Sequence, residues 1–407
     1  MAWKETDAMN ERAMMIGEWL RGEDTVSGLA VKYGVSRKAV YKWIGRHAEG
    51  GWGALADRSR AALNHPNAVG AEVERLLLEF KACKPLWGAP KLRCKLVEAL
   101  GEEKCPAEST VSEMLRRHGS SGVRGKARRR AVPSQEPMGH CLGANQVWCT
   151  DFKGWFRTGD GGKCTPLTIT DGHSRYLLRC QGLGGSTGTL AVKPLFISTF
   201  REFGLPLSMR SDNGPPFASC GLGGLSELSV WWMLLGIRLE RIEPGKPQQN
   251  GRHERMHRTL KDATADPPRG NLREQQAAFD AFQKEYNEER PHEALGQKPP
   301  ATSYERSARE YPVRLPKQAG YPDEWEKRRV RGAGQMKWKG KDVRISDALQ
   351  GQEIGLKPLA DGEWAVYFEQ VELGRFDERK GKVSGLKRAA RKDGGSSQAP
   401  GTDEVKT

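Results

Sequence analysis

Apolar positions in the first part of the chain recur every three or four residues, which is the period of amphipathic helices. The pattern predicts three short helices at residues 11–20, 26–33 and 37–46. Gly34 supplies a turn after the second helix, and Ser36 is a favourable capping residue for the third. Two short helices joined by a glycine turn are typical of a helix-turn-helix unit.

The third expected helix has an apolar face and a polar face that is suited to DNA. Its polar face carries Arg37, Lys38, Tyr41 and Lys42, and a recognition helix inserts such side chains into the major groove. A small helical bundle with a solvated charged face would give the same pattern. The residues alone leave these two interpretations open.

Helical periodicity returns in a second block, at residues 71–83, 89–100 and 109–118. The last helix of this block ends in Arg116 and Arg117, which makes the block a candidate second DNA-binding unit. The sequence that begins at these two residues, RRHGSSGVRGKARRR, holds seven basic residues and no acidic one. Such a segment is typical of a flexible linker that follows phosphates, or of one that only adds solubility.

From about residue 145 the pattern changes to short β-rich runs that alternate with helical segments, which predicts an α/β domain. Strands are expected at 147–152, 164–171, 175–182, 206–212 and 237–243. Helices are expected at 188–203, 224–235, 251–264 and 272–288.

The C-terminal part combines a polar connector, four or five short strands that predict a small β-barrel, and a basic tail. The chain is therefore expected to be multidomain. Its segments are a helix-turn-helix domain (1–50), a second helical DNA-binding domain (70–120), a basic linker (121–143), the α/β domain (144–305), a connector (306–331), the β-barrel (332–378) and a basic disordered tail (379–407).

The balance of charge favours a polyanionic partner over a membrane. The 407 residues include 66 Lys and Arg against 51 Asp and Glu, a net charge of +15, and such an excess indicates nucleic acid first. We find no apolar run long enough to span a membrane and no signal-peptide pattern, so we expect a soluble cytoplasmic protein. The eight Cys lack Cys-x-x-Cys spacing, which favours reduced thiols over a zinc site.

Three acidic residues occupy positions that are unusual for a purely structural role. Asp151 interrupts the apolar strand VWCTDF, where an unpaired carboxylate is costly. Asp212 ends a strand at the turn DNGPP, from which its side chain can project into a crevice. Glu254 lies in the first turns of a helix, where the helix dipole favours its ionised form.

The same three residues are candidate catalytic residues and candidate metal ligands. Carboxylate oxygens are the ligands that Mg²⁺ prefers, and Mn²⁺ accepts the same ligands. Two such ions about 4 Å apart can activate an attacking hydroxyl and stabilise the departing oxygen of a phosphodiester. Three carboxylates can hold two ions, so Asp151, Asp212 and Glu254 predict a site for phosphodiester chemistry.

The residues around these acids resemble those of DDE transposases with a retroviral-integrase-like catalytic core. The motifs that carry the resemblance are TDF around Asp151, TDGHSRY (170–176), SDNGPPF (211–217), PGKPQQNGRHERMHRTLK (244–261) and YNEERPHEALGQKPP (286–300). Together they look like the core motifs of bacterial insertion-sequence transposases. The similarity covers about 145–305, and the helix-turn-helix and the barrel fit the same arrangement more loosely.

The resemblance implies a ribonuclease-H-like fold, with Asp151 on the first strand, Asp212 after the fourth strand and Glu254 facing both from a helix. It also implies a bacterial protein that binds the terminal inverted repeats of its element, exposes 3′-hydroxyls and joins them to target DNA. Since two ends must be joined, a homo-oligomer on DNA is expected. The zinc-binding His and Cys cluster of integrases is missing, so the helix-turn-helix units are expected to recognise the ends.

Glu254, Arg258 and Lys261 are spaced to share one face of their helix. The family analogy supports a DNA-contacting role for the two cations, and a solvated Glu254–Arg258 pair is the alternative.

Two other features are expected to be structural. Asp171 lies beside a tight hairpin, where an Asp commonly accepts hydrogen bonds from turn amides. Trp231 and Trp232 are expected in a core or an interface rather than against DNA bases.

The helix of Glu254 also offers a rival interpretation. Its sequence HERMH (253–257) matches the H-E-x-x-H motif of zinc proteases. The surrounding arginines would oppose Zn²⁺, and this motif explains neither Asp151 nor Asp212. A second alternative is a catalytically inactive DNA-binding regulator of the same fold.

Overall fold

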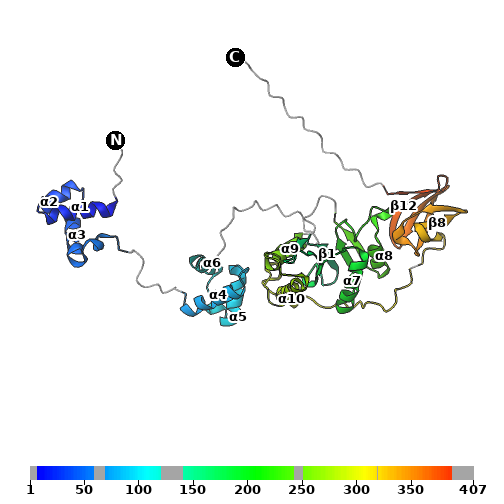
Figure 1. The fold of residues 1–407 in the computed structure, drawn as a ribbon, viewed down its shortest axis with the longest axis horizontal. Helices are drawn as coiled ribbons and strands as arrows, with labels where there is room; N and C mark the ends of the chain where they lie inside the picture. The colour runs from blue at the N-terminus through cyan, green and yellow to red at the C-terminus, as the bar shows by residue number, and fades with distance from the viewer. Residues whose placement is uncertain (1–6, 59–68, 121–140, 243–250, 319, 387–407) are drawn as a thin grey trace, which may run out of the picture. The chain divides into compact units, whose positions relative to one another are not determined.

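The structure, a computed structural model, describes residues 7–58, 69–120, 141–242, 251–318 and 320–386. These residues form two compact units, of which the first ends at Gly70 and the second begins at Ala71. The first unit is helical, whereas the second contains helices and strands (Figure 1). No helix in the described ranges is long and apolar enough to cross a membrane.

The first unit is the three-helix bundle that the sequence predicts. Its elements are α1 (Ala8–Leu20), α2 (Val26–Lys32), α3 (Arg37–Gly50) and the 3₁₀ turn η1 (Trp52–Leu55). Ile16, Leu29 and Val40 are fully buried at its centre. The Ser36 side chain caps α3, as expected. The helix runs past its expected end because the chain turns only at Gly51, whose φ is 64°.

The second helical block consists of α4 (Ala71–Cys83), α5 (Ala89–Leu100) and α6 (Glu108–Arg117), close to the expected bounds. The turn between α4 and α5 contacts the end of α10 (Leu272–Glu288). Trp87 is buried and donates through Nε1 to Glu285 Oε1 at 2.8 Å, and Lys84 Nζ lies 2.5 Å from Glu289 Oε2. No pattern in the sequence indicates these contacts.

A six-stranded mixed sheet forms the centre of the second unit. Its strands are β1 (Val147–Phe152), β2 (Phe156–Arg157), β3 (Lys163–Asp171), β4 (Leu177–Leu183), β5 (Ser208–Ser211) and β6 (Arg238–Arg241). β3 pairs antiparallel with β4, and also with β1 and β2, while β1, β5 and β6 are parallel. Apart from the two-residue β2, Asp212 follows the fourth strand, as the resemblance implies.

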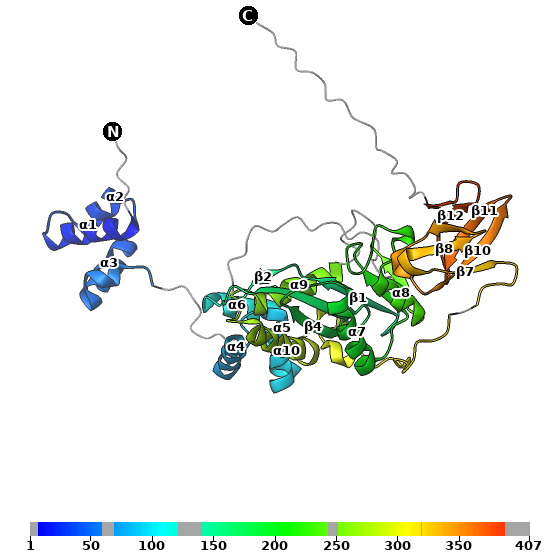
Figure 2. The same ribbon diagram turned by 45° about the vertical axis from the view of Figure 1, so that its right-hand side comes forward.

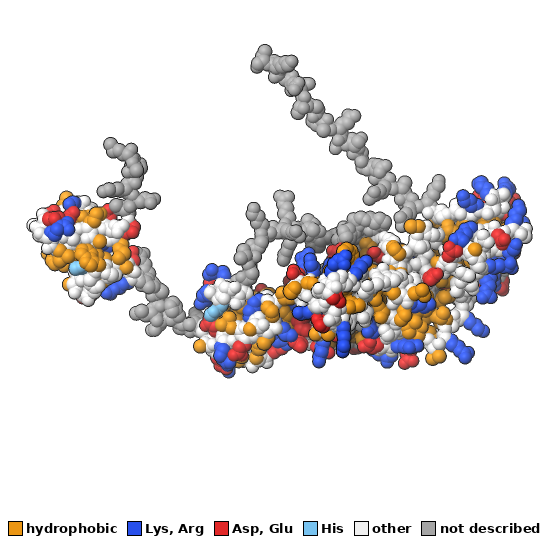
Figure 3. Space-filling view, viewed as in Figure 1, with side chains coloured by type: hydrophobic (Ala, Val, Ile, Leu, Met, Phe, Trp, Pro, Cys, Tyr) orange, Lys and Arg blue, Asp and Glu red, His pale blue; other side chains and the backbone are white. Residues whose placement is uncertain are grey.

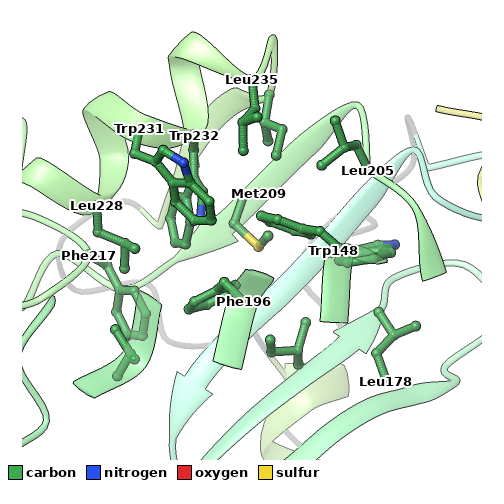
Figure 4. Close-up of a cluster of buried hydrophobic side chains, with 14 of the residues drawn as sticks. Trp148, Leu178, Phe196, Leu205, Met209, Phe217, Leu228, Trp231, Trp232 and Leu235 are labelled. Carbon is green, nitrogen blue, oxygen red and sulfur yellow. The ribbon is translucent and has the colours of Figure 1, made fainter. Parts of the chain in front are cut away.

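Helices cover both faces of this sheet. One face packs on α7 (Thr189–Phe203) and α8 (Glu227–Leu234), and the other packs on α9 (Gly251–Thr264) and α10. Trp231 and Trp232 of α8 are 4% and 0% exposed and pack with Phe196 of α7 (Figure 4). They are core residues, as predicted. The other face buries Leu177 against Met256 of α9.

The C-terminal strands form two sheets around one apolar core (Figure 2). The strands are β7 (Glu326–Arg329), β8 (Gln335–Trp338), β9 (Lys341–Arg344), β10 (Glu353–Ala360), β11 (Glu363–Phe368), β12 (Val371–Asp377) and β13 (Lys382–Gly385). Two boundaries predicted from the sequence are wrong. β7 lies in the expected connector 306–331 and pairs with β10, and β13 lies in the expected tail 379–407 and pairs with β12.

Two other expected segments lie mostly outside the described residues. The basic linker 121–143 is described only from residue 141, and the tail is described only as far as residue 386.

Candidate active site

Asp151 lies near the end of β1 and pairs in register with Thr168 of β3. Its side chain is 24% exposed. The backbone N–H of Phe152 donates to Asp151 Oδ1 at 2.8 Å. One carboxylate oxygen is therefore fixed by the strand itself, and the other oxygen, Oδ2, is left for a different partner.

The register of the sheet places Asp212 beside Asp151. β1 and β5 run parallel, and Val147 pairs with Ser208 while Cys149 pairs with Arg210. This offset of 61 residues equals the separation of Asp151 and Asp212, so the two aspartates occupy equivalent levels where the strands end. Asp212 is exposed.

Glu254 is exposed in the first turn of α9. The opposite side of this helix buries His253, Met256, His257 and Leu260 against the sheet. The packing of these residues fixes α9 on the sheet and leaves the side chain of Glu254 on the solvent side.

Electrostatics links the three acids. The pKa of Asp151 is raised to about 7, chiefly by burial and also by the negative charges of Asp212 and Glu254, while the Phe152 N–H and Lys153 lower it. Each of the two other acids is therefore close enough to repel charge on Asp151. A site that concentrates negative charge in this way favours a cation.

The donor set fits hard divalent ions. All three candidate ligands offer carboxylate oxygens, which suit Mg²⁺ and Mn²⁺. Within the described residues, no three His, Cys, Asp or Glu side chains are already arranged as a closed metal cluster. Since Asp212 and Glu254 are exposed, their side chains are not confined by packing and can turn toward an ion.

The two histidines of HERMH do not form an open zinc site. His253 and His257 are 2% and 5% exposed. Their Nε2 atoms lie 2.7 and 2.6 Å from Thr168 Oγ1, and His253 Nδ1 lies 2.8 Å from Thr170 Oγ1. Both rings are held by threonine hydroxyls on the sheet side of α9, whereas Glu254 faces solvent. This arrangement is evidence against the protease interpretation.

The expected DNA-contact residues of the first unit are all on the surface. Arg37, Lys38, Tyr41 and Lys42 are exposed on α3, and Tyr41 is 63% exposed. Lys42 Nζ lies 4.9 Å from the centre of the Trp43 ring, which packs in the bundle core. The polar face of α3 is therefore free to contact a ligand.

The other expected DNA-contact residues fall into two groups. Arg116 and Arg117 are exposed at the end of α6, and both pair with Glu113, at 2.6 and 3.7 Å. Arg258 and Lys261 are exposed on α9, and no ion pair joins either to Glu254 within the described residues. The alternative Glu254–Arg258 pair is thus not formed.

Asp171 is structural, as predicted. It is 1% exposed, and its carboxylate accepts hydrogen bonds from Asn145 N, Ser174 N and Ser174 Oγ, each at 2.7 Å. Because both carboxylate oxygens already accept hydrogen bonds from Asn145 and Ser174, Asp171 is poorly placed to bind a metal ion.

Comparison with known protein families assigns most of the chain to recognised domains. The matches are a helix-turn-helix domain (residues 11–62), a homeodomain-like domain (39–115), the integrase core domain in two parts (142–247 and 235–300) and the C-terminal domain of IS481 family transposases (326–384). The last match includes β7, consistent with the corrected start of the C-terminal sheets.

Two curated relatives are uncharacterized proteins of insertion elements. The 31.7 kDa protein of IS407 from Burkholderia multivorans is 29% identical over 183 residues, which are 44% of this chain and 63% of that protein. The 39.2 kDa protein of IS476 from Xanthomonas euvesicatoria is 28% identical over 180 residues, 44% of this chain and 49% of that protein. The chain thus spans about half to under two thirds of the length of these relatives.

Among solved structures, the chain is similar to the HTLV-2 integrase catalytic core domain in complex with magnesium. The identity is 17%, the alignment covers 40% of this chain and 99% of that chain, and the TM-score is 0.32.

Proposed function

The chain carries the helix-turn-helix, integrase core and IS481-type C-terminal domains of an insertion-sequence transposase, and from this premise we propose that it transposes DNA. It binds the terminal inverted repeats of its element, cleaves there to expose 3′-hydroxyls, and joins these to target DNA in the bacterial cytoplasm. The observation that carries the proposal is the register of β1 and β5, whose offset of 61 residues aligns Asp151 with Asp212. The charge of Glu254 also raises the pKa of Asp151, so the third acid lies near the other two.

Asp151, Asp212 and Glu254 are the residues that would hold two Mg²⁺ or Mn²⁺ ions. Such ions, when bound, supply Lewis-acid activation of an attacking hydroxyl and charge stabilisation of the departing oxygen. The chain contributes a strand that fixes one oxygen of Asp151 and a partly buried setting in which charges interact more strongly than in water.

The rest of the molecule supplies DNA contacts. Arg258 and Lys261 lie on the exposed side of α9 with Glu254, where they would meet the phosphates next to the scissile bond. Lys and Arg side chains gather over the C-terminal strands (Figure 3), which suits sequence-independent contact with phosphates. Because one reaction joins two DNA ends, we expect a homo-oligomer on DNA.

The test is end cleavage and strand transfer by the full chain. Duplexes taken from the DNA that flanks the coding region are incubated with the protein and Mg²⁺ or Mn²⁺, and scrambled duplexes serve as controls. Nicks at the element's ends and joined products support the proposal. Specific binding to the end duplexes without DNA cleavage would instead establish an inactive DNA-binding regulator. Digestion of a protein substrate in the presence of Zn²⁺ would support the zinc-protease interpretation.

We expect the double substitution Lys38→Gln and Lys42→Gln to weaken end binding. Both cations are exposed on α3, and losing two phosphate contacts flattens the dependence of log affinity on log salt by about two units. Mobility shifts of the full chain over a range of salt measure this slope.

A matched control for this substitution lies in the same unit. Lys32 is exposed on α2, but its Nζ pairs with Glu18 at 2.8 Å. Lys32→Gln should leave the salt slope unchanged. If the salt slope falls equally in the control, or does not fall in the double variant, α3 is not part of the DNA interface.

A further inference from the structure

A buried polar cluster lies directly beneath Asp151. Thr168 of β3 is opposite Asp151 in the sheet, and its Oγ1 lies 3.2 Å from the Asp151 carbonyl oxygen. The same Oγ1 lies 2.7 Å from His253 Nε2 and 2.6 Å from His257 Nε2. One hydroxyl therefore meets three polar atoms, two of which come from the catalytic helix α9.

The proton count of these contacts favours one tautomer for both rings. A threonine hydroxyl has one proton to donate and two lone pairs that accept. The carbonyl of Asp151 can only accept, so it takes the hydroxyl proton of Thr168. Both lone pairs of Oγ1 then accept, which requires His253 and His257 to carry their protons on Nε2.

The other ring nitrogens are consequently without protons. A neutral imidazole carries a single N–H, and deep burial disfavours the charged form of both rings. Nδ1 of His253 accepts a hydrogen bond from Thr170 Oγ1 at 2.8 Å. Nδ1 of His257 lies 3.9 Å from Asp151 Oδ2, a distance beyond hydrogen-bond range, as expected for two atoms that both carry lone pairs.

This tautomer leaves Asp151 Oδ2 without a donor on the side of His257. The Phe152 N–H already occupies Oδ1. If His257 carried its proton on Nδ1 instead, a small movement would form a charge-assisted hydrogen bond to Oδ2, and a metal ion would have to displace it.

We infer that Thr168 and His257 are positioning residues for Asp151: the Thr168 hydroxyl locks the proton of His257 on Nε2, so that no hydrogen-bond donor competes with a divalent cation for Asp151 Oδ2. The inference rests on the proposed metal-dependent function. It also gives His257 of HERMH a role that neither zinc binding nor DNA contact supplies.

The test replaces Thr168 with Val, which keeps the shape of the side chain but removes the hydroxyl. His257 then loses its Nε2 acceptor and gains from donating through Nδ1 to Asp151. Titration of the full chain with Mn²⁺ alone should show affinity weakened about tenfold, the effect of one charge-assisted hydrogen bond. In ¹⁵N-histidine NMR, His257 Nδ1 should be unprotonated in the wild type and protonated in the variant.

Two controls separate this effect from a loss of packing. Thr168→Ser keeps the hydroxyl and should restore the wild-type tautomer and Mn²⁺ affinity. Thr170→Val removes another buried hydroxyl, which hydrogen-bonds to His253, and it should leave the tautomer of His257 unchanged. If Thr168→Val does not fold, the wild-type NMR spectrum still decides the tautomer.

The outcomes distinguish the inference from the function on which it rests. A protonated His257 Nδ1 in the wild type, or unchanged Mn²⁺ affinity in folded Thr168→Val, overturns the inference. A wild type that does not bind Mn²⁺ overturns the metal site and the inference together. Mn²⁺ binding with the expected tautomer but no DNA cleavage overturns the proposed function alone.

Discussion

Asp151→Asn and Asp212→Asn are each expected to lower end cleavage and strand transfer by about a thousandfold or more while leaving DNA binding intact. Each substitution keeps the shape of the side chain and removes a charge that, under the proposed function, would hold a divalent ion. Metal ions contribute several kcal/mol of transition-state stabilisation, and each 1.36 kcal/mol is a factor of ten in rate. Cleavage of end duplexes with Mg²⁺ and mobility shifts measure the two properties.

Asp280→Asn is the matched control for these substitutions. Asp280 is exposed on α10 and accepts a hydrogen bond from Gln276 Nε2, which an Asn oxygen can also accept. This variant should cleave at the wild-type rate. Full cleavage by Asp151→Asn or Asp212→Asn would show that these residues are not the catalytic pair.

The sequence predicts the position of the central strands well because their signal is local. The run VWCTDF gives the bounds of β1, Val147–Phe152. The sequence alone does not show that Asp151 and Asp212 are neighbours in space. Their spacing of 61 residues indicates proximity only because β1 and β5 are parallel and paired at the same offset.

Two of the missed strands, β7 and β13, lack an apolar alternation. β7 has the sequence EKRR and none of its residues is buried, and β13 has the sequence KVSG with only Val383 buried. Both strands form by pairing with neighbours, β10 and β12, that are themselves clear from their sequence. Pairing across the sheet thus overrides the weak local preference of such segments.

The cluster beneath Asp151 could not be predicted for a different reason. Thr168 and His253 are separated by 85 residues, and neither local sequence indicates a contact with the other residue. Local sequence instead offered the H-E-x-x-H motif, which is a pattern of spacing on one helix. Only the packing of α9 on β3 shows that threonine hydroxyls contact both ring nitrogens of His253 and the Nε2 atom of His257.

Because the pKa of Asp151 is raised in the fold, we expect the free energy of unfolding of the metal-free protein to fall as the pH rises. The pKa is about 7 in the fold against the ordinary 3.8, so the folded state holds the proton more tightly than the unfolded state does. The penalty is absent below pH 4, develops between pH 4 and 7, and is complete above pH 7. A shift of about three units corresponds to at most about 4 kcal/mol.

Asp151→Asn removes that ionisation, so the variant should be more stable than the wild type at pH 8 and nearly equal to it at pH 3.5. Urea unfolding of both proteins in EDTA at several pH values measures the difference, in which the titration of all other groups cancels to first order. Mg²⁺ should narrow the gap at pH 8, because an ion that binds only the folded wild type stabilises it by mass action. A difference that does not change with pH would mean that Asp151 ionises normally, and the electrostatic link to Asp212 and Glu254 would then be wrong.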